Sequence, residues 1–229
     1  MTNTYALIEN LSHANREIAF QAKNELLKQG SSIVPLLISA LASHDQSLLM
    51  EVVRMLGLFK KEARTAIKAL ITICYINNPK LRANVISSLG LIAENAELCV
   101  PVLKRYLKDD SVEVRRHTVE ALGQFREASR SVTYELAIAL QDRDAVVREL
   151  AAGSLYELGS VPFHVLPNLF KARQDSNPYV KLSITQLLGK ISRDNGMSVT
   201  DLGEICHQVK SYPEKNSRVP PFPLQLVTS

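Results

Sequence analysis

A leucine recurs every 33 residues along most of this 229-residue chain. The members of this first column are Leu37, Leu70, Leu103, Leu136, Leu169 and Leu202. A second leucine column has the same spacing and consists of Leu56, Leu89, Leu122, Leu155 and Leu188. Glycine follows the second column at 57, 90, 123 and 189, with Tyr156 as the exception. Several columns in one register indicate a repeat array, in which each unit buries its apolar face against its neighbours.

Each unit reads as a pair of helices. Val114, Thr118 and Leu122 follow the i, i+4, i+8 spacing of one helix face. A shorter apolar helix precedes them, with Pro101 in its first turn, where a missing N–H costs nothing. The turn between the two helices carries Asp and Ser, which can cap the second helix. We call the first helix of a unit the A helix and the second the B helix.

The columns place the A helices near 31–42, 62–76, 97–108, 129–141, 161–173 and 198–210. They place the B helices near 15–28, 46–59, 79–93, 111–126, 144–158 and 177–193. Lys23 stands where the second leucine column should continue, which is typical of a polar terminal cap. The sequence thus predicts an all-α, right-handed α-solenoid of about six to seven hairpins, with one domain over residues 1–210 and a Pro-rich tail over 211–229.

The tail departs from the repeat because its prolines forbid a continuing helix. They are Pro213, Pro220, Pro221 and Pro223. Its apolar residues, such as Phe222 and Leu224, could dock on the last unit or bind a partner, and disorder is the third alternative.

Composition argues against several functional classes. The formal net charge of +4 does not by itself imply a nucleic-acid partner, and no apolar stretch approaches a membrane span. The N-terminal segment lacks the pattern of a signal peptide, and three cysteines make no disulfide framework. We therefore expect a cytoplasmic protein that does not enter a membrane.

A motif within the units resembles the HEAT repeat. Its pattern is Asp, Arg six residues later, and then a small residue with Leu-Gly. The motif is carried by Asp109…Arg115 with Ala121-Leu122-Gly123, by Asp142…Arg148 with Ser154-Leu155, and more weakly by Asp175…Lys181. Asn10…Arg16 repeats the spacing in the first unit, while the third unit keeps Arg82 but has Ile76 in place of Asp. The resemblance implies that these Asp and Arg residues pair along the stack as a structural ladder. The alternative is a basic stripe that binds phosphates.

Catalytic and cofactor patterns are weak. HEAT-like deoxyhypusine hydroxylase holds iron through His-Glu pairs, and this sequence has no His-Glu dipeptide. Cys74 and Cys99 occupy columns of buried apolar residues, and Cys206 and its neighbour His207 point about 100° apart on a helix. We predict no catalytic residue, metal or cofactor, and hence no enzyme, although a lyase-type activity stays open.

Two further resemblances remain as alternatives. Short HEAT-like chains include phycobilin lyases and phycobilisome-degradation proteins, whose units resemble Val114-Arg115 here, but no residue identifies a bilin site. Nucleic-acid binding is the weaker alternative, because the basic cluster of Lys104, Arg105 and Lys108 is not interleaved with aromatic residues.

The favoured hypothesis is a non-catalytic scaffold that binds a protein partner. In HEAT-like stacks the B helices line the concave face, and their variable columns here differ in chemistry from unit to unit. A mixed surface suits a protein better than a repeating polymer. The predicted partner-binding residues are Glu51, Arg54, Asn84, Arg116, His117, Glu120, Glu149, Leu150, Leu182 and Gln186.

Overall fold

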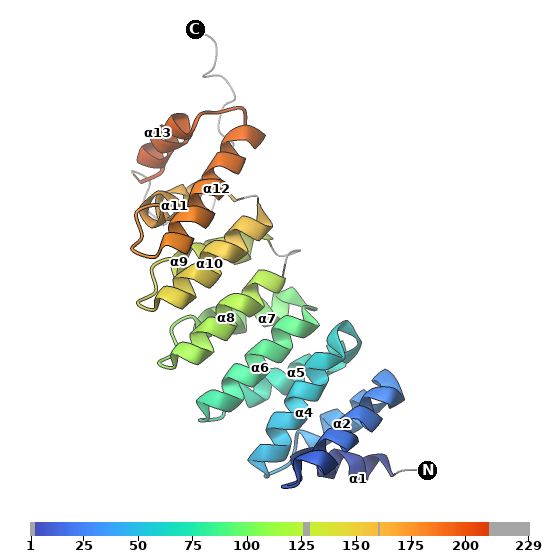
Figure 1. Ribbon diagram of the computed structural model, residues 1–229. Coiled ribbons are helices and arrows are strands. Elements are labelled where there is room, and N and C mark those ends of the chain that lie inside the picture. Colours follow the sequence, from blue (N-terminus) through green and yellow to red (C-terminus); the bar gives the residue numbers. More distant parts are fainter. Residues whose placement is uncertain (1–2, 126–128, 160, 211–229) are drawn as a thin grey trace.

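The computed structural model describes residues 3–125, 129–159 and 161–210, with side chains described for 3–125, 132–159 and 161–207. Helices follow one another throughout these ranges, and no strand occurs in them. The B helices are α2 (Arg16–Gln29), α4 (Gln46–Leu58), α6 (Pro79–Ile92), α8 (Val112–Gln124), α10 (Ala145–Leu158) and α12 (Pro178–Asp194). Figure 1 shows them stacked in one row from the N-terminal to the C-terminal end. The chain is an α-solenoid, as the period predicted.

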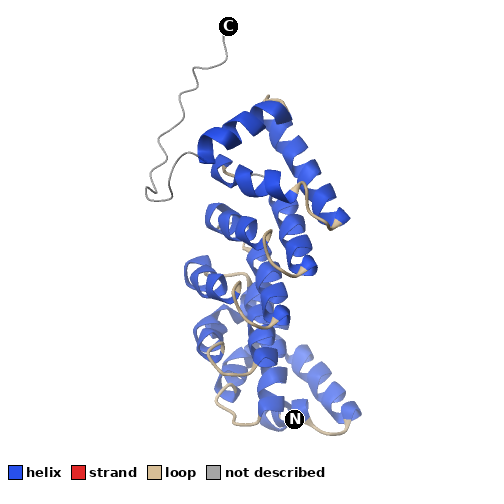
Figure 2. Cartoon of the chain, turned by 90° about the vertical axis from the view of Figure 1, so that its left-hand side faces the viewer, coloured by secondary structure: helices blue, strands red, loops and turns tan. Residues whose placement is uncertain are grey.

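The A helices form a second row beside the first (Figure 2). They are α1 (Thr4–Glu9), α3 (Val34–Ala40), α5 (Ile67–Ile73), α7 (Ala96–Tyr106), α9 (Ser129–Ala139), α11 (Leu166–Ala172) and α13 (Val199–Lys210). Helix α1 pairs with α2 and was not among the predicted A helices. The A helices are mostly shorter than predicted, because 3-10 turns precede α3, α5 and α11.

Both leucine columns lie between the two rows. Each member is at most 1% exposed, so the rows bury a continuous apolar layer along the whole stack. Polar N-cap residues start the B helices because their side chains accept hydrogen bonds from first-turn amides; in α8 the cap position, Ser111, makes no such bond. The N-cap positions are Asn15, Asp45, Asn78, Ser111, Asp144 and Asn177.

The first unit is three residues shorter than the others. Its N-cap Asn15 precedes Asp45 by 30 residues, whereas later caps are 33 apart. The shortening lies after the B helix, where the 3-10 segment Gly30–Ile33 has four residues and its counterpart Lys60–Ala66 has seven. Leu26, fully buried, therefore takes the place of Leu56, and the interpretation of Lys23 as a break in the column was wrong. By the same shift Arg16 is the first residue of α2 rather than a counterpart of Arg115.

Small residues bring three pairs of neighbouring B helices into close contact. A Cβ on Gly90 would lie 2.7 Å from the Cα of Ala121. The same contact joins Gly57 to Ser88, whose hydroxyl donates to the carbonyl of Val53 at 2.9 Å. Gly123 meets Ser154 in the next unit. Close approach of these backbones explains the glycines at 57, 90 and 123.

The two outer junctions of the B row lack these contacts. The shifted register puts Leu27 and Met55 at the small positions between α2 and α4, and the standard register puts Tyr156 and Leu187 there between α10 and α12. Large side chains hold helix axes further apart than glycine does. We therefore expect neighbouring B helices to lie closer together in the middle of the row than at its two ends.

Candidate partner-binding face

The ten residues predicted for partner binding come from five successive B helices, α4 to α12, and all are half-buried or exposed. We call this set the B face. No single chemical group repeats along it, so its geometry has to be described helix by helix.

At α4 and α6 the B face is a small hydrogen-bonded network. Arg54 Nη1 contacts Glu51 Oε1 at 2.8 Å within α4. Its Nε also donates to Asn84 Oδ1 of α6 at 3.4 Å. The structure therefore brings three predicted residues from two units together, and the guanidinium is held between the helices.

At α8 a second arginine is fixed by the following unit. Arg116 Nε and Nη2 donate to the two carboxylate oxygens of Asp144 at 3.1 and 3.0 Å. These hydrogen bonds hold the pKa of Asp144 below its usual value. Asp144 also accepts from the amide of Val147 and so caps α10. Sequence reasoning missed this pair, although an acidic N-cap one unit after an exposed arginine is a readable signal.

His117 lies beside Arg116 on the same helix. Its Nδ1 is 3.1 Å from Glu120 Oε2, and both side chains are partly exposed. This pair lies within one unit and leaves polar atoms open to a partner.

At α10 and α12 the B face becomes more apolar. Glu149 accepts a hydrogen bond of 3.1 Å from Asn177, the N-cap of α12. Leu150 is half-buried, whereas Leu182 is 56% exposed and Gln186 is exposed. Tyr179, one turn from Leu182, is 64% exposed and was not among the predicted site residues. An exposed leucine beside an exposed tyrosine is typical of a contact surface.

The recurring arginines lie deeper than the B face and join neighbouring units. Each forms a bidentate ion pair with the aspartate of the following turn, and each also donates to the backbone carbonyl at the turn of its own unit. The Nε–Oδ2 distances are 3.0 Å for Arg82–Asp109, 2.8 Å for Arg115–Asp142 and 2.7 Å for Arg148–Asp175. The backbone acceptors are the carbonyls of Ile76, Asp109 and Asp142.

We call these three Arg–Asp ion pairs the rungs, and their environment is largely dry. The side chains of Arg115 and Asp142 are 5% and 10% exposed. Hydrogen bonds from Arg148 hold the pKa of Asp175 below its usual value, and its own turn amide at Asn177 adds to the effect. Lys181 is exposed and only contributes a weaker electrostatic effect on Asp175. Bidentate pairs in this setting fix the angle between units rather than offering charge to a ligand.

The basic cluster of Lys104, Arg105 and Lys108 lies on the A row, and two of its side chains contact other residues of the chain. Lys104 forms a 2.5 Å ion pair with the buried Glu135 of α9. The guanidinium of Arg105 lies 5.4 Å from the centre of the Tyr75 ring. Two of its charges therefore already have partners within the chain.

The cysteines are buried, as the columns predicted for Cys74 and Cys99, and Cys206 is buried too. Burial raises the pKa of the Cys74 thiol to about 12 and that of Cys99 to about 11. In the described part of the chain, no group of three His, Cys, Asp or Glu side chains is arranged to hold a metal ion. None of the helices described is long and apolar enough to cross a membrane.

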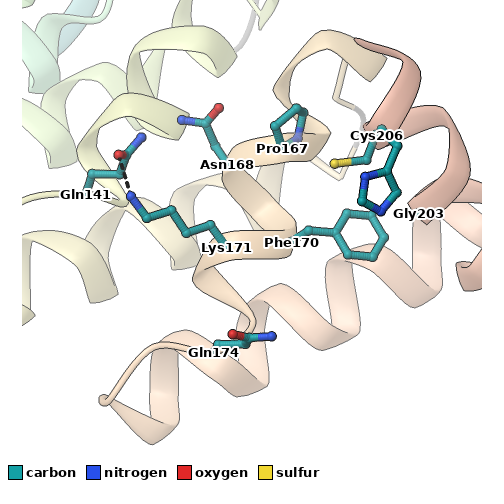
Figure 3. A pocket seen from close by; sticks show the side chains of 9 residues that line it. Gln141, Pro167, Asn168, Phe170, Lys171, Gln174, Gly203 and Cys206 are labelled. Atoms are coloured by element: carbon teal, nitrogen blue, oxygen red, sulfur yellow. Dashed lines mark hydrogen bonds between the residues drawn. The ribbon is translucent and has the colours of Figure 1, made fainter. Parts of the chain in front are cut away.

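A hollow of about 580 Å³ lies between α11 and α13 on the A row. Figure 3 shows Phe170, Gly203 and Cys206 on one side and Lys171, hydrogen-bonded to Gln141 at 3.0 Å, on the other. The hollow shares no residue with the B face.

Comparison with known proteins places the fold. Residues 67–156 match the family model of HEAT repeats, and no curated protein matches the chain. A solved engineered protein is 19% identical, with a TM-score of 0.59 over 84% of this chain and 98% of the other. A designed armadillo repeat protein in complex with the peptide (KR)4 is 14% identical, with a TM-score of 0.60 over 82% of this chain and 99% of the other. The chain therefore has an α-solenoid fold, and residues 67–156 in its centre are similar to HEAT repeats.

Proposed function

We propose that this protein is a non-catalytic scaffold that binds a protein partner on the B face. One observation carries the proposal: polar side chains of the B face are held in place by residues of the next unit. Arg54 is held by Asn84, Arg116 by Asp144 and Glu149 by Asn177. Side chains ordered in advance lose less entropy when a partner binds.

The chemistry of the face supports a folded protein or a peptide over a repeating polymer. Charged pairs at α4 and α8 give way to Leu150, Leu182 and Tyr179 at α10 and α12. A partner that matches this order would bury an apolar contact at one end and satisfy polar groups along the rest. The designed armadillo protein with a bound peptide has the same overall fold, which fits this type of recognition.

The test reverses charges on α4 and α8 of the B face without touching the inter-unit pair of Arg116. The variant carries Arg54→Glu and Glu120→Lys, and the matched control carries Arg64→Glu and Glu97→Lys. All four side chains are exposed, and the control residues lie in the 3-10 segment before α5 and in α7, both on the A row. The two variants therefore have the same composition and net charge.

Affinity capture from the source cells identifies the protein that wild type retains, and that purified protein is then titrated against all three chains. We expect affinity to fall at least tenfold for the B-face variant, about 1.4 kcal/mol, and to be unchanged for the control. Circular dichroism checks that both variants keep their helix content. Equal affinities for the B-face variant and wild type, or equal losses in both variants, would overturn the assignment to the B face.

A further inference from the structure

The last described B helix presents an uncovered edge. In the four B helices from α4 to α10, the next B helix covers a column of apolar residues, each 0% exposed: Val53, Ile86, Val119 and Ala152. The corresponding residue of α12 is Thr185, which is exposed. Leu182 and Tyr179, on the same part of α12, are 56% and 64% exposed.

The position of Leu182 shows what kind of neighbour this edge lacks. Its counterparts Arg116 and Glu149 contact the N-cap residues of the next B helices, Asp144 and Asn177. Leu182 carries no polar group with which to reach such a cap. An apolar side chain at this position fits an apolar neighbour instead.

The chain itself supplies a candidate directly after α13. A helices of successive units run in the same direction, so the end of α13 lies at the same border of the stack as the start of α12. Residues 211–229 come after Lys210 and include Val219, Phe222 and Leu224 among prolines. Prolines favour an extended polyproline conformation with a rise of about 3.1 Å per residue.

Length allows this segment to reach along the edge. At that rise 19 residues span about 59 Å, whereas the 17 residues of α12 span about 26 Å at 1.5 Å each. We propose that residues 219–227 pack in extended form along the exposed edge of α12, with Phe222 and Leu224 against Tyr179 and Leu182. The segment then covers Tyr179 and Leu182 while no partner is bound, and a partner that contacts this end of the B face has to displace it.

A cysteine trap tests the contact in the full-length protein. The test pair is Leu182→Cys with Phe222→Cys, in a background with Cys206→Ala; Cys74 and Cys99 stay because they are buried. The matched control pairs Phe222→Cys with Glu113→Cys, since Glu113 is exposed and occupies the Tyr179 column two units away. A third pair, with Phe170→Cys, samples the hollow on the A row.

We expect the test pair to form an intramolecular disulfide at least tenfold faster than either other pair under mild oxidation. Equal rates for the test and Glu113 pairs, or a faster reaction at Phe170, would overturn the proposal. A disulfide between chains that increases with protein concentration would instead assign the edge to a second copy, which also overturns it.

Hydrogen exchange gives a second readout that needs no substitution in α12. A chain that stops after Lys210 should exchange its Tyr179–Thr185 amides severalfold faster than the full chain, while α6 amides stay unchanged. Identical exchange in the two chains would contradict the docked segment. Both experiments use the protein alone, so their outcome is independent of whether the B face binds a partner.

Discussion

The units from α6 to α12 and the first two units share the same apolar layer but are joined differently. Between α6 and α12 every junction has a dry bidentate rung, as in Arg115–Asp142. In the first two units the rung positions hold Leu49 and Ile76, and neutral or exposed groups connect the turns instead. Asn78 donates to Gln46 at 3.0 Å and Ser12 to Asp45 at 3.2 Å. Leucine columns suffice to stack units, whereas the rungs add a fixed angle between them.

The largest effect is expected from breaking a rung. Arg115→Ala leaves the Asp142 carboxylate 10% exposed and without its bidentate partner, which should lower the free energy of unfolding by about 3–5 kcal/mol. The control Arg16→Ala removes an exposed arginine from the first unit and should change it by less than about 0.5 kcal/mol. Urea unfolding followed by circular dichroism measures both, and similar losses would show that the rungs do not distinguish the two regions.

Breaking a glycine contact should cost less. Gly90→Ala places a methyl group 2.7 Å from the backbone of Ala121, so the helices have to separate at a cost of about 1–3 kcal/mol. Gly153→Ala is the matched control because nothing lies within 4 Å of its added Cβ; it should stabilise the helix by up to about 1 kcal/mol. Thermal unfolding measures the two changes, and a loss of stability in both would point to a general effect of alanine on these helices.

The missing rung can be added to the N-terminal region. Leu49→Arg with Ile76→Asp recreates the 27-residue spacing of the existing pairs. A double-mutant cycle should give a favourable coupling of roughly 0.5–3 kcal/mol, since Leu49→Arg alone buries an unpaired charge at a site that is 5% exposed. Additive effects of the two substitutions would mean that the turn geometry of these units cannot hold a rung.

The smallest expected effect is on how steeply the free energy of unfolding falls as the pH is lowered, as distinct from the loss of the ion pair itself. The pKa of Asp175 in the folded state lies below its unfolded value of about 3.9, because Arg148 donates to it. Its contribution is therefore complete above the unfolded pKa and is lost as the pH falls through the folded pKa. Asp175→Asn should flatten the decline of unfolding free energy below about pH 4 relative to wild type; equal slopes in the variant and wild type would contradict this.

The sequence predicted the fold in detail because its 33-residue period appears at buried positions. The core there accepts only apolar side chains of a certain size. Leu37 and Leu202 mark the two ends of one buried layer, and the resemblance to the HEAT repeat implied that arginines such as Arg115 pair with an aspartate of a neighbouring unit. The shortening of the first unit could not be seen in the first leucine column, because that column begins at Leu37, after the shortened connection. Leu26 could be recognised as the partner of Leu56 only from the positions of the helix caps.

The candidate site was less predictable for a physical reason. Periodicity identifies which residues face outward, but it does not say which of them are occupied by a neighbour. Arg116 has an outward position and is nevertheless held by Asp144. Tyr179 is more exposed than the predicted Leu182, because exposure on α12 depends on the neighbouring segments of the stack as well as on the helix itself.

The uniform spacing of the caps from Asp45 to Asn177 makes the middle of the molecule modular. Removing residues 110–142 would join Asp109 to Arg143 with the helix phase preserved, and Arg82 and Arg148 would keep their aspartates. The first unit is not interchangeable in this way, because its connection is three residues shorter. The later turns can therefore accommodate the addition or removal of whole 33-residue units. The shorter connection after the first unit cannot.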